Sequence, residues 1–403
     1  MTISTEPGPH PLAFPFSSAS ALSCCPEYQQ LRATEPVCRI ELPYGGQAWL
    51  VTSYAEAATV LSAPGFSRAA TMGRDLPRET PEQQSRSNLQ ALDPPEHTRV
   101  RNLAARALTP RRIAALRPQV ERHSAELLAA MQASGPPADL MSCYARQLPV
   151  RLVSELRGIP PSDQDRLQAW SDATSANTSV PPARRQQLEA ELTDYVTALI
   201  AERRARPGND LISALITARD GGQQLTEPEL VELTTIVLVG GNDTTSNQLG
   251  NFAFVLLTHP AQLQALRENP SLIPAAVEEL VRFIPFGAGT MLPRVAIQPA
   301  VLGGQQINPG DVLLIANESA NRDERVFGDG EQIDFGRATN PHLGFGHGPH
   351  YCLGAHQARL QLQVAVQHWL ELLPGLRLAV PPEQIEWRDD QIVRGPAALP
   401  VSW

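Results

Sequence analysis

Apolar residues recur every three or four positions through most of the chain after Pro94, a spacing that places them on one face of a helix. The segment 173–182 interrupts this pattern because it is rich in Ser, Thr, Asn and Pro, which favour turns. The pattern predicts helices over 96–107, 111–132, 140–156, 161–170, 183–206, 210–219 and 274–283.

Strand-like alternation occurs toward the two ends of the chain. Val37–Val51 contains two alternating runs around Gly45-Gly46, which predicts a hairpin, and a short helix is expected over 53–61. Residues 67–92 lack periodicity and predict a long loop, which in a compact fold usually serves a function. Further strands are expected over 294–298, 301–307 and 311–315.

Helices therefore outnumber strands, and no linker divides the chain. We expect one mainly α domain over residues 1–403, with a flexible segment over residues 1–15.

The longest helical pattern covers 226–257 and has a weak middle. Thr226 and Glu229 form a capping box at its start, and His259-Pro260 ends it. Gly240 and Gly241 each cost about 1 kcal/mol relative to alanine in a helix. The glycines would serve either close helix packing or a local kink.

Asp243 and Thr244 follow this glycine pair. Thr244 shares a helix face with the glycines, and Asp243 lies beside that face. An acid and an alcohol at a helix distortion are suited to moving protons toward a ligand in the adjoining groove.

The acidic balance narrows the classes of partner. The formal net charge is −9, which argues against nucleic acid as a main partner. No run approaches the ~18 continuous apolar residues of a membrane span, and residues 1–14 lack the features of a signal peptide. We therefore expect no membrane anchor and a cytoplasmic protein. The five cysteines are irregularly spaced and do not suggest a disulfide framework.

Cys352 stands apart from the other cysteines because glycines surround it and a helical pattern follows it. Glycines let the backbone turn its N–H groups toward the sulfur, and the positive end of a following helix lowers the pKa of a thiol. Such a thiolate can bind a metal, and a cysteine-ligated haem supports O–O cleavage.

Charged residues near predicted element ends complete the pattern. Glu279 and Arg282 lie one helical turn apart, which on a surface would be an ordinary ion pair. Four basic residues would together suit two carboxylates, although each alone is typical of solvated surface; they are His97, Arg101, Arg294 and His350.

The order of these motifs resembles the bacterial, soluble type of the cytochrome P-450 superfamily, the haem-thiolate monooxygenases. The similar segments run from about residue 40 to the C-terminus; they are 93–101, 240–245, 279–282, 321–323, 335–337 and 345–354. Gly240 stands where alanine is more usual, and Asn242 is polar where many members are apolar. The resemblance implies a mainly α triangular prism with a small β-rich region near the N-terminus.

The resemblance also implies roles for individual residues. Cys352 would be the axial ligand of the iron of haem b, and Asp243 and Thr244 would deliver protons to dioxygen. Glu279, Arg282 and Arg337 would support the cysteine loop. The implied haem contacts are His97, Arg101, Gly240, Gly241, Arg294, Phe345, His350 and Gly354, of which the basic ones would hold the propionates.

Substrate and partners follow from the same resemblance. Dioxygen would be the co-substrate, and electrons would come from NAD(P)H through a reductase and a ferredoxin, with Arg106, Arg111 and Arg112 as candidates for the docking face. We expect a monomer that oxidises a bulky natural-product intermediate of secondary metabolism by hydroxylation or epoxidation. Candidate pocket residues are Asn242, Gly287, Ala288, Gly289, Thr290 and Val393.

Three alternatives remain open from the sequence. The same haem chemistry could serve oxidative C–C or C–N coupling, desaturation or nitration. A haem sensor or electron carrier is a different class, although neither needs the Asp243-Thr244 pair. A zinc site built on Cys352 and nearby histidines fits no common zinc spacing.

Overall fold

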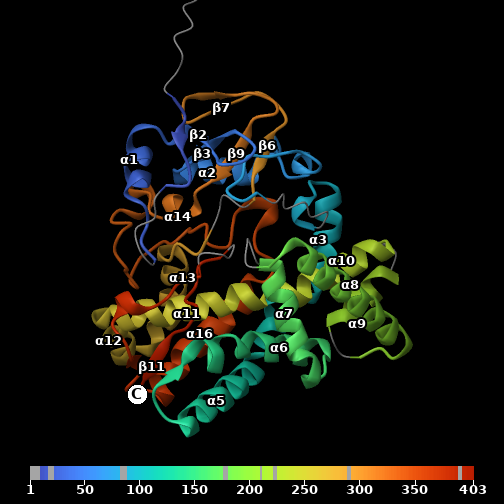
Figure 1. Cartoon of the computed structure of the whole chain (residues 1–403), viewed down its shortest axis with the longest axis vertical. Coiled ribbons are helices and arrows are strands. Elements are labelled where there is room, and N and C mark those ends of the chain that lie inside the picture. Colours follow the sequence, from blue (N-terminus) through green and yellow to red (C-terminus); the bar gives the residue numbers. More distant parts are fainter. Residues whose placement is uncertain are drawn as a thin grey trace, which may run out of the picture.

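The computed structural model describes residues 10–16, 22–81, 89–175, 180–208, 211–220, 225–287, 292–388 and 393–403. The main β-sheet lies at one end of the molecule, and the rest is mostly helical, with α11 crossing the middle and the small sheet that contains β11 toward the other end (Figure 1). The predicted mainly helical fold with a β region near the N-terminus is therefore confirmed. Of the predicted flexible segment 1–15, residues 10–15 are described, and Leu12–Ala13 forms strand β1.

The helices have the following bounds: α1 Pro26–Thr34, α2 Tyr54–Ser62, α3 Glu96–Ala107, α4 Pro110–Ala114, α5 Arg117–Ser134, α6 Gln147–Arg157, α7 Gln164–Ser175, α8 Pro182–Ala205, α9 Leu211–Asp220, α10 Glu227–Val239, α11 Asn242–Thr258, α12 Pro260–Glu268, α13 Ile273–Phe283, α14 Asn317–Ala320, α15 Glu324–Phe327 and α16 Ala355–Leu372.

The remaining strands are β2 Val37–Glu41, β3 Gln47–Val51, β4 Phe66–Ser67, β5 Ala138–Asp139, β6 Arg294–Ala296, β7 Ala300–Leu302, β8 Gln305–Ile307, β9 Val312–Ile315, β10 Arg377–Leu378 and β11 Pro400–Ser402. The main sheet has the order β1-β2-β3-β9-β6-β4. Its centre joins distant parts of the chain, because β3 pairs in parallel with β9, with Trp49 opposite Leu313.

Two predicted helices are shorter or divided. The predicted helix 111–132 is wrong as a single element: α4 ends at Ala114 and α5 begins at Arg117. Pro118 explains the division, because it lacks the N–H that would bond to the carbonyl of Ala114 and is tolerated only in a first turn. The predicted start of 140–156 is a π-helical turn over Met141–Ala145 that precedes α6.

One segment predicted as a single strand forms two strands. Residues 301–307 form the hairpin β7–β8, because Gly303 and Gly304 have φ of 56° and 82°, values that glycine adopts without strain. The hairpin predicted over Val37–Val51 is confirmed as β2–β3.

The long pattern 226–257 forms two helices. The capping box is present, with the Thr226 N–H bonded to Glu229 Oε2 at 2.8 Å. α10 ends at Val239 and α11 begins at Asn242, so the helix is interrupted at Gly240-Gly241, as expected for a local kink, one of the two predicted roles of these glycines. α11 is buried along almost its whole length and packs against α16, the helix that follows Cys352.

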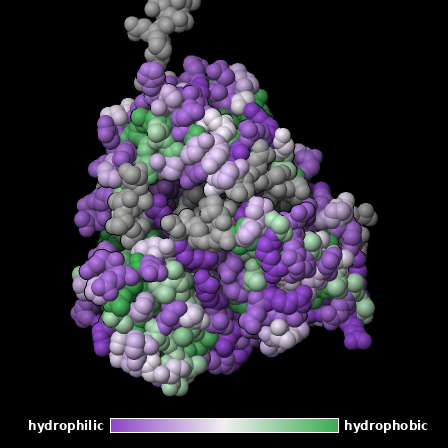
Figure 2. Space-filling view, in the orientation of Figure 1, coloured by the Kyte–Doolittle hydropathy of each residue, from purple (hydrophilic) through white to green (hydrophobic). Residues whose placement is uncertain are grey.

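Hydrophilic residues dominate the face shown in Figure 2, and hydrophobic ones form small, separate patches there. Among the helices of the described residues, none combines the length and the apolar character that a membrane crossing needs.

Candidate functional site

The cysteine loop is a tight turn that presents Cys352 at the start of α16. The Cys352 N–H donates to the carbonyl of Phe345 at 2.8 Å, which closes the loop. Gly346 and Gly348 have φ of 75° and 67°, a region that side chains with a Cβ rarely adopt. A Cβ at Gly348 would also lie 2.7 Å from the Leu61 carbonyl oxygen. The glycines are therefore required by the turn itself.

The Cys352 side chain is accessible, and charged groups lie around its thiol. Its side chain is exposed, yet burial raises the pKa of the thiol, against a hydrogen bond from the Gly354 N–H and the positive charges of Arg101 and Arg359, which lower it. Nearby protein atoms therefore remove part of the hydration of the sulfur, although the side chain stays accessible.

The predicted support of this loop is a buried ion cluster. Arg282 forms a two-pronged pair with Glu279 at 2.7 and 2.8 Å, and both are about 1% exposed. Arg337 Nε lies 3.2 Å from Glu279 Oε2, and the Asp334 N–H also donates to this carboxylate. Burial alone would raise the pKa of Glu279, but these hydrogen bonds lower it below the ordinary value. The structure thus brings the three predicted residues together.

A second ion cluster beside it is absent from the sequence predictions. Arg359 of α16 donates to both oxygens of Glu278 on α13, each at 2.7 Å, and His342 Nε2 lies 3.1 Å from the same carboxylate. The guanidinium of Arg359 also stacks 4.4 Å above the centre of the Phe345 ring. Glu278 precedes Glu279, and this adjacency of two carboxylates on one helix was the only signal in the sequence.

The four predicted basic residues converge on one buried place. The rings of His97 and His350 lie 4.2 Å apart between centroids. Burial and the charge of Arg294 lower the pKa of His350 to about 3, and burial lowers that of Arg294 to about 9. Arg101 donates to the carbonyl of Tyr351, next to Cys352.

Arg68 belongs to this cluster, although the sequence did not single it out. Its side chain donates to the carbonyls of Gln90 at 2.9 Å and Pro293 at 2.5 Å, and burial lowers its pKa to about 10. Asp93 receives the backbone N–H of Arg68 at 2.8 Å. Arg68 lies in the predicted loop 67–92. This segment has no periodicity, so the sequence did not indicate where the Arg68 side chain points.

This basic cluster fits a ligand with two carboxylates. The carboxylate of Asp93 raises the pKa of His97, Arg294 and His350, but each of the three pKa values stays low. Positive groups are therefore in excess over carboxylates in this cluster. Both ring nitrogens of His97 are buried and have no hydrogen-bond partner within the described ranges. Buried polar groups in proteins are normally paired, so these nitrogens and the positive charge suit acidic groups of a bound molecule.

The helix break presents a second accessible face. Gly240 is exposed although the residues on either side of the break, Val239 and Asn242, are buried. The hydroxyl of Thr244 donates to the carbonyl of Gly240 at 3.1 Å, and Thr244 is half-buried. Gln248, one helical turn beyond Thr244, is buried, so only the end of this face nearest the break is open.

The side chains of Asp243 and Thr244 contact different partners. Its carboxylate Oδ1 lies 3.5 Å from Nη1 of Arg388, in the C-terminal part of the chain, and its side chain is 3% exposed. Asn242, predicted as a pocket residue, is fully buried and donates to the carbonyl of Leu238 at 3.1 Å, its own helix rather than a pocket.

The other predicted pocket residues are partly described. Gly287 and Val393 form an isolated antiparallel bridge, which brings two distant segments together. Ala288, Gly289 and Thr290 lie outside the described residues, and so does the side chain of Arg106. Arg111 and Arg112 are exposed on α4.

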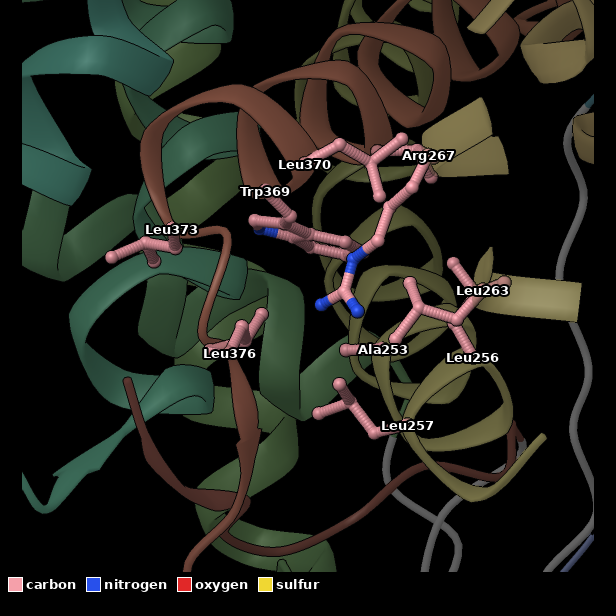
Figure 3. A pocket seen from close by; sticks show the side chains of 10 residues that line it. Ala253, Leu256, Leu257, Leu263, Arg267, Trp369, Leu370, Leu373 and Leu376 are labelled. Atoms are coloured by element: carbon pink, nitrogen blue, oxygen red, sulfur yellow. The ribbon is translucent and has the colours of Figure 1, made fainter. Parts of the chain in front are cut away.

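A small apolar pocket lies away from these groups. It sits between α11, α12 and α16, and the guanidinium of Arg267 reaches in among the leucines and Trp369 that line it (Figure 3). It encloses about 10 Å³, space for about one water molecule, and therefore cannot hold a substrate.

Comparison with known proteins agrees with this geometry. The model of the family "Cytochrome P450" matches residues 27–394. The mycinamicin IV hydroxylase/epoxidase of Micromonospora griseorubida is 44% identical over 393 residues, which cover 98% of this chain and 99% of the relative. The nocardicin C N-oxygenase of Nocardia uniformis subsp. tsuyamanensis is 42% identical over 392 residues, 97% of this chain and 98% of the relative.

A solved structure shows the same fold. A mutant of the mixed-function P450 MycG in complex with mycinamicin IV superposes with a TM-score of 0.92 at 44% identity, covering 98% of this chain and 100% of that one. The chain belongs to the cytochrome P450 family. It has the P450 fold and is a cytochrome P450 monooxygenase, and its family implies haem.

Proposed function

We propose that this P450 is a haem-thiolate monooxygenase that hydroxylates or epoxidises a bulky, partly polar natural product with electrons from a ferredoxin system in the cytoplasm. The observation that carries the proposal is the turn around Cys352, which leaves an accessible sulfur next to the start of α16. The buried basic cluster, with its excess of positive charge, is the second support.

In this proposal the chain would hold haem b at two places, its iron and its acidic groups. Cys352 would hold the haem iron through its sulfur, and Phe345 and Gly354 would lie beside it. His97, Arg101, Arg294 and His350 would hold the acidic groups of haem, and we add Arg68. A thiolate-ligated haem, when bound, supplies the activation of dioxygen.

The chain's own residues then hold and move protons. Gly240 and Gly241 leave space at the break, and the half-buried hydroxyl of Thr244 lies at its edge. Asp243 is the nearest carboxyl in the sequence, and its contact with Arg388 at 3.5 Å orients it. Glu279, Arg282 and Arg337 hold the cysteine loop and take no part in proton transfer.

The substrate class rests on the relatives and on the region around Gly287 and Val393. Two relatives, at 44% and 42% identity, bear the names of a mycinamicin IV hydroxylase/epoxidase and a nocardicin C N-oxygenase. The first favours a macrolide-sized substrate. The second makes oxidation at nitrogen the alternative reaction.

A CO difference spectrum tests the haem-thiolate proposal. Reduced wild-type protein with CO is expected to show the strongly red-shifted Soret band of thiolate-ligated haem, and Cys352→His to lose it. A band typical of imidazole-ligated haem in the wild type would contradict the proposal.

A substrate-shift screen tests the substrate class. Macrolide and aromatic peptide scaffolds are expected to shift the spin state at lower concentration than fatty acids or monoterpenes. Product masses from the binding scaffold then separate oxygen insertion from oxidative coupling. Tighter binding of a fatty acid or a monoterpene would contradict the proposed substrate.

A further inference from the structure

The hydroxyl of Ser171 lies inside the break between α10 and α11. In an uninterrupted helix the Asp243 N–H would donate to the carbonyl of Val239, four residues earlier. Here the Ser171 hydroxyl donates to the Val239 carbonyl at 3.2 Å and accepts from the Asp243 N–H at 3.3 Å. A hydroxyl can do both at once. Ser171 therefore occupies the place of one helical hydrogen bond.

Ser171 comes from a different helix. It lies on α7, which packs against both α10 and α11. Ser171, Val239 and Asp243 are 1%, 5% and 2% exposed, so solvent does not readily replace the hydroxyl. A side chain that enters the hydrogen-bond ladder is a recognised cause of a kink.

Around the break, side chains donate hydrogen bonds to the successive backbone carbonyls of residues 237–240. The Leu238 carbonyl accepts from Asn242 and the Gly240 carbonyl from Thr244, both by local contacts. Val237 accepts from the guanidinium of Arg157, at the end of α6. Among these donors, Ser171 is the one that also receives an N–H from the far side of the break.

The glycines alone do not keep the helices apart. Gly240 has φ and ψ of −65° and −16°, and Gly241 has −103° and −6°, so both lie near the helical region. Small changes in these angles would let Val239 and Asp243 bond directly. Something outside the segment must hold it open, and Ser171 is in position to do so.

We propose that Ser171 is a positioning residue whose hydroxyl keeps α10 and α11 apart at the break and thereby sets the positions of Asp243 and Thr244. Its effect on turnover rests on the proposed function. Its effect on the helix does not.

The test compares haem-loaded wild type, Ser171→Ala and Ser246→Ala. Ser246 is a matched control, because it is equally buried and its hydroxyl donates to the Asn242 carbonyl of its own helix at 2.7 Å. Without the Ser171 hydroxyl, Val239 and Asp243 are expected to bond directly. In a crystal structure of Ser171→Ala the Asp243 nitrogen should then lie about 3 Å from the Val239 carbonyl oxygen, the distance of a helical hydrogen bond.

Turnover gives the second measurement. In Ser171→Ala, product formed per NADPH is expected to fall several-fold and hydrogen peroxide to rise, while the substrate dissociation constant and the CO spectrum stay those of the wild type. Ser246→Ala should match the wild type in all four.

The outcomes separate the two proposals. A Ser171→Ala structure in which Val239 and Asp243 stay apart, or the same coupling loss in Ser246→Ala, would overturn the role of Ser171. A wild type without the thiolate CO band would overturn the proposed function, and the structure of the variant would still decide whether the hydroxyl holds the helix open.

Discussion

Cys352 sits between opposing electrostatic effects. Burial raises the pKa of its thiol, whereas the Gly354 N–H and the charges of Arg101 and Arg359 lower it. Arg359 is itself held by Glu278, so a carboxylate on α13 fixes one of the charges that favour a thiolate. The loop therefore depends on partners well outside its own sequence.

Thr244→Ala is expected to uncouple the enzyme. Without the hydroxyl at the edge of the break, product formed per NADPH should fall several-fold and hydrogen peroxide should rise, with little change in substrate affinity. Thr235→Ala is the control, because Thr235 on α10 makes the same kind of hydrogen bond to its own helix, to the Val231 carbonyl at 2.9 Å. Equal coupling in the two variants would show that Thr244 does not position the protons.

At the scale of elements, features that depend on residues close together in the sequence were predicted correctly. The Thr226 capping box, the Gly240-Gly241 break and the hairpin around Gly45-Gly46 are all present. The errors arose where one residue changes hydrogen bonding inside a continuous apolar pattern. Pro118 divides the predicted helix 111–132, and periodicity does not register a missing N–H.

The candidate site divides in the same way. The motifs indicated Cys352 and the basic residues individually, and the family resemblance placed them together. Arg68 and the Glu278–Arg359 pair were not predicted, because their contacts join residues far apart in the chain; Glu278 and Arg359 are 81 positions apart. Only the folded packing of α13 on α16 determines such a contact.

Glu278→Gln tests this pair as a link between two helices. The hydrogen bonds from His342 and Arg359 outweigh burial and lower the pKa of Glu278 from 4.5 to about 2. A carboxylate with a lowered folded-state pKa stabilises the protein fully above its unfolded pKa and loses that contribution as the pH falls toward the folded value. The substitution should therefore lower the free energy of unfolding by about 2 kcal/mol at pH 7.

Urea denaturation at several pH values measures this effect. The difference between wild type and Glu278→Gln should shrink as the pH falls from about 4.5 toward 2. Glu383→Gln, at an exposed position, should match the wild type throughout. A difference independent of pH would mean that lost packing, rather than lost charge, destabilises the variant.

At the scale of the whole molecule, charge is unevenly distributed. The formal net charge is −9, yet Arg111 and Arg112 are both exposed on the short helix α4. An acidic ferredoxin would be attracted to such a pair despite the overall repulsion, because charges act over about 10 Å at 0.1 M salt.

Arg111→Glu combined with Arg112→Glu is therefore expected to slow reduction by ferredoxin several-fold at low salt and to have little effect at high salt. Stopped-flow reduction at two ionic strengths measures this, with Arg377→Glu on β10 as an exposed control. The same slowing in the control would place the docking face elsewhere.

The order of strands in the main sheet has a consequence for the making of the protein. β3 ends at Val51, and its parallel partner β9 begins at Val312. On the ribosome, the N-terminal hairpin must wait while roughly 260 further residues are added, tens of seconds at typical rates of synthesis. Throughout that time one edge of β3 has no partner strand. The newborn chain is thus most prone to aggregation early, and the sheet closes only when synthesis is mostly complete.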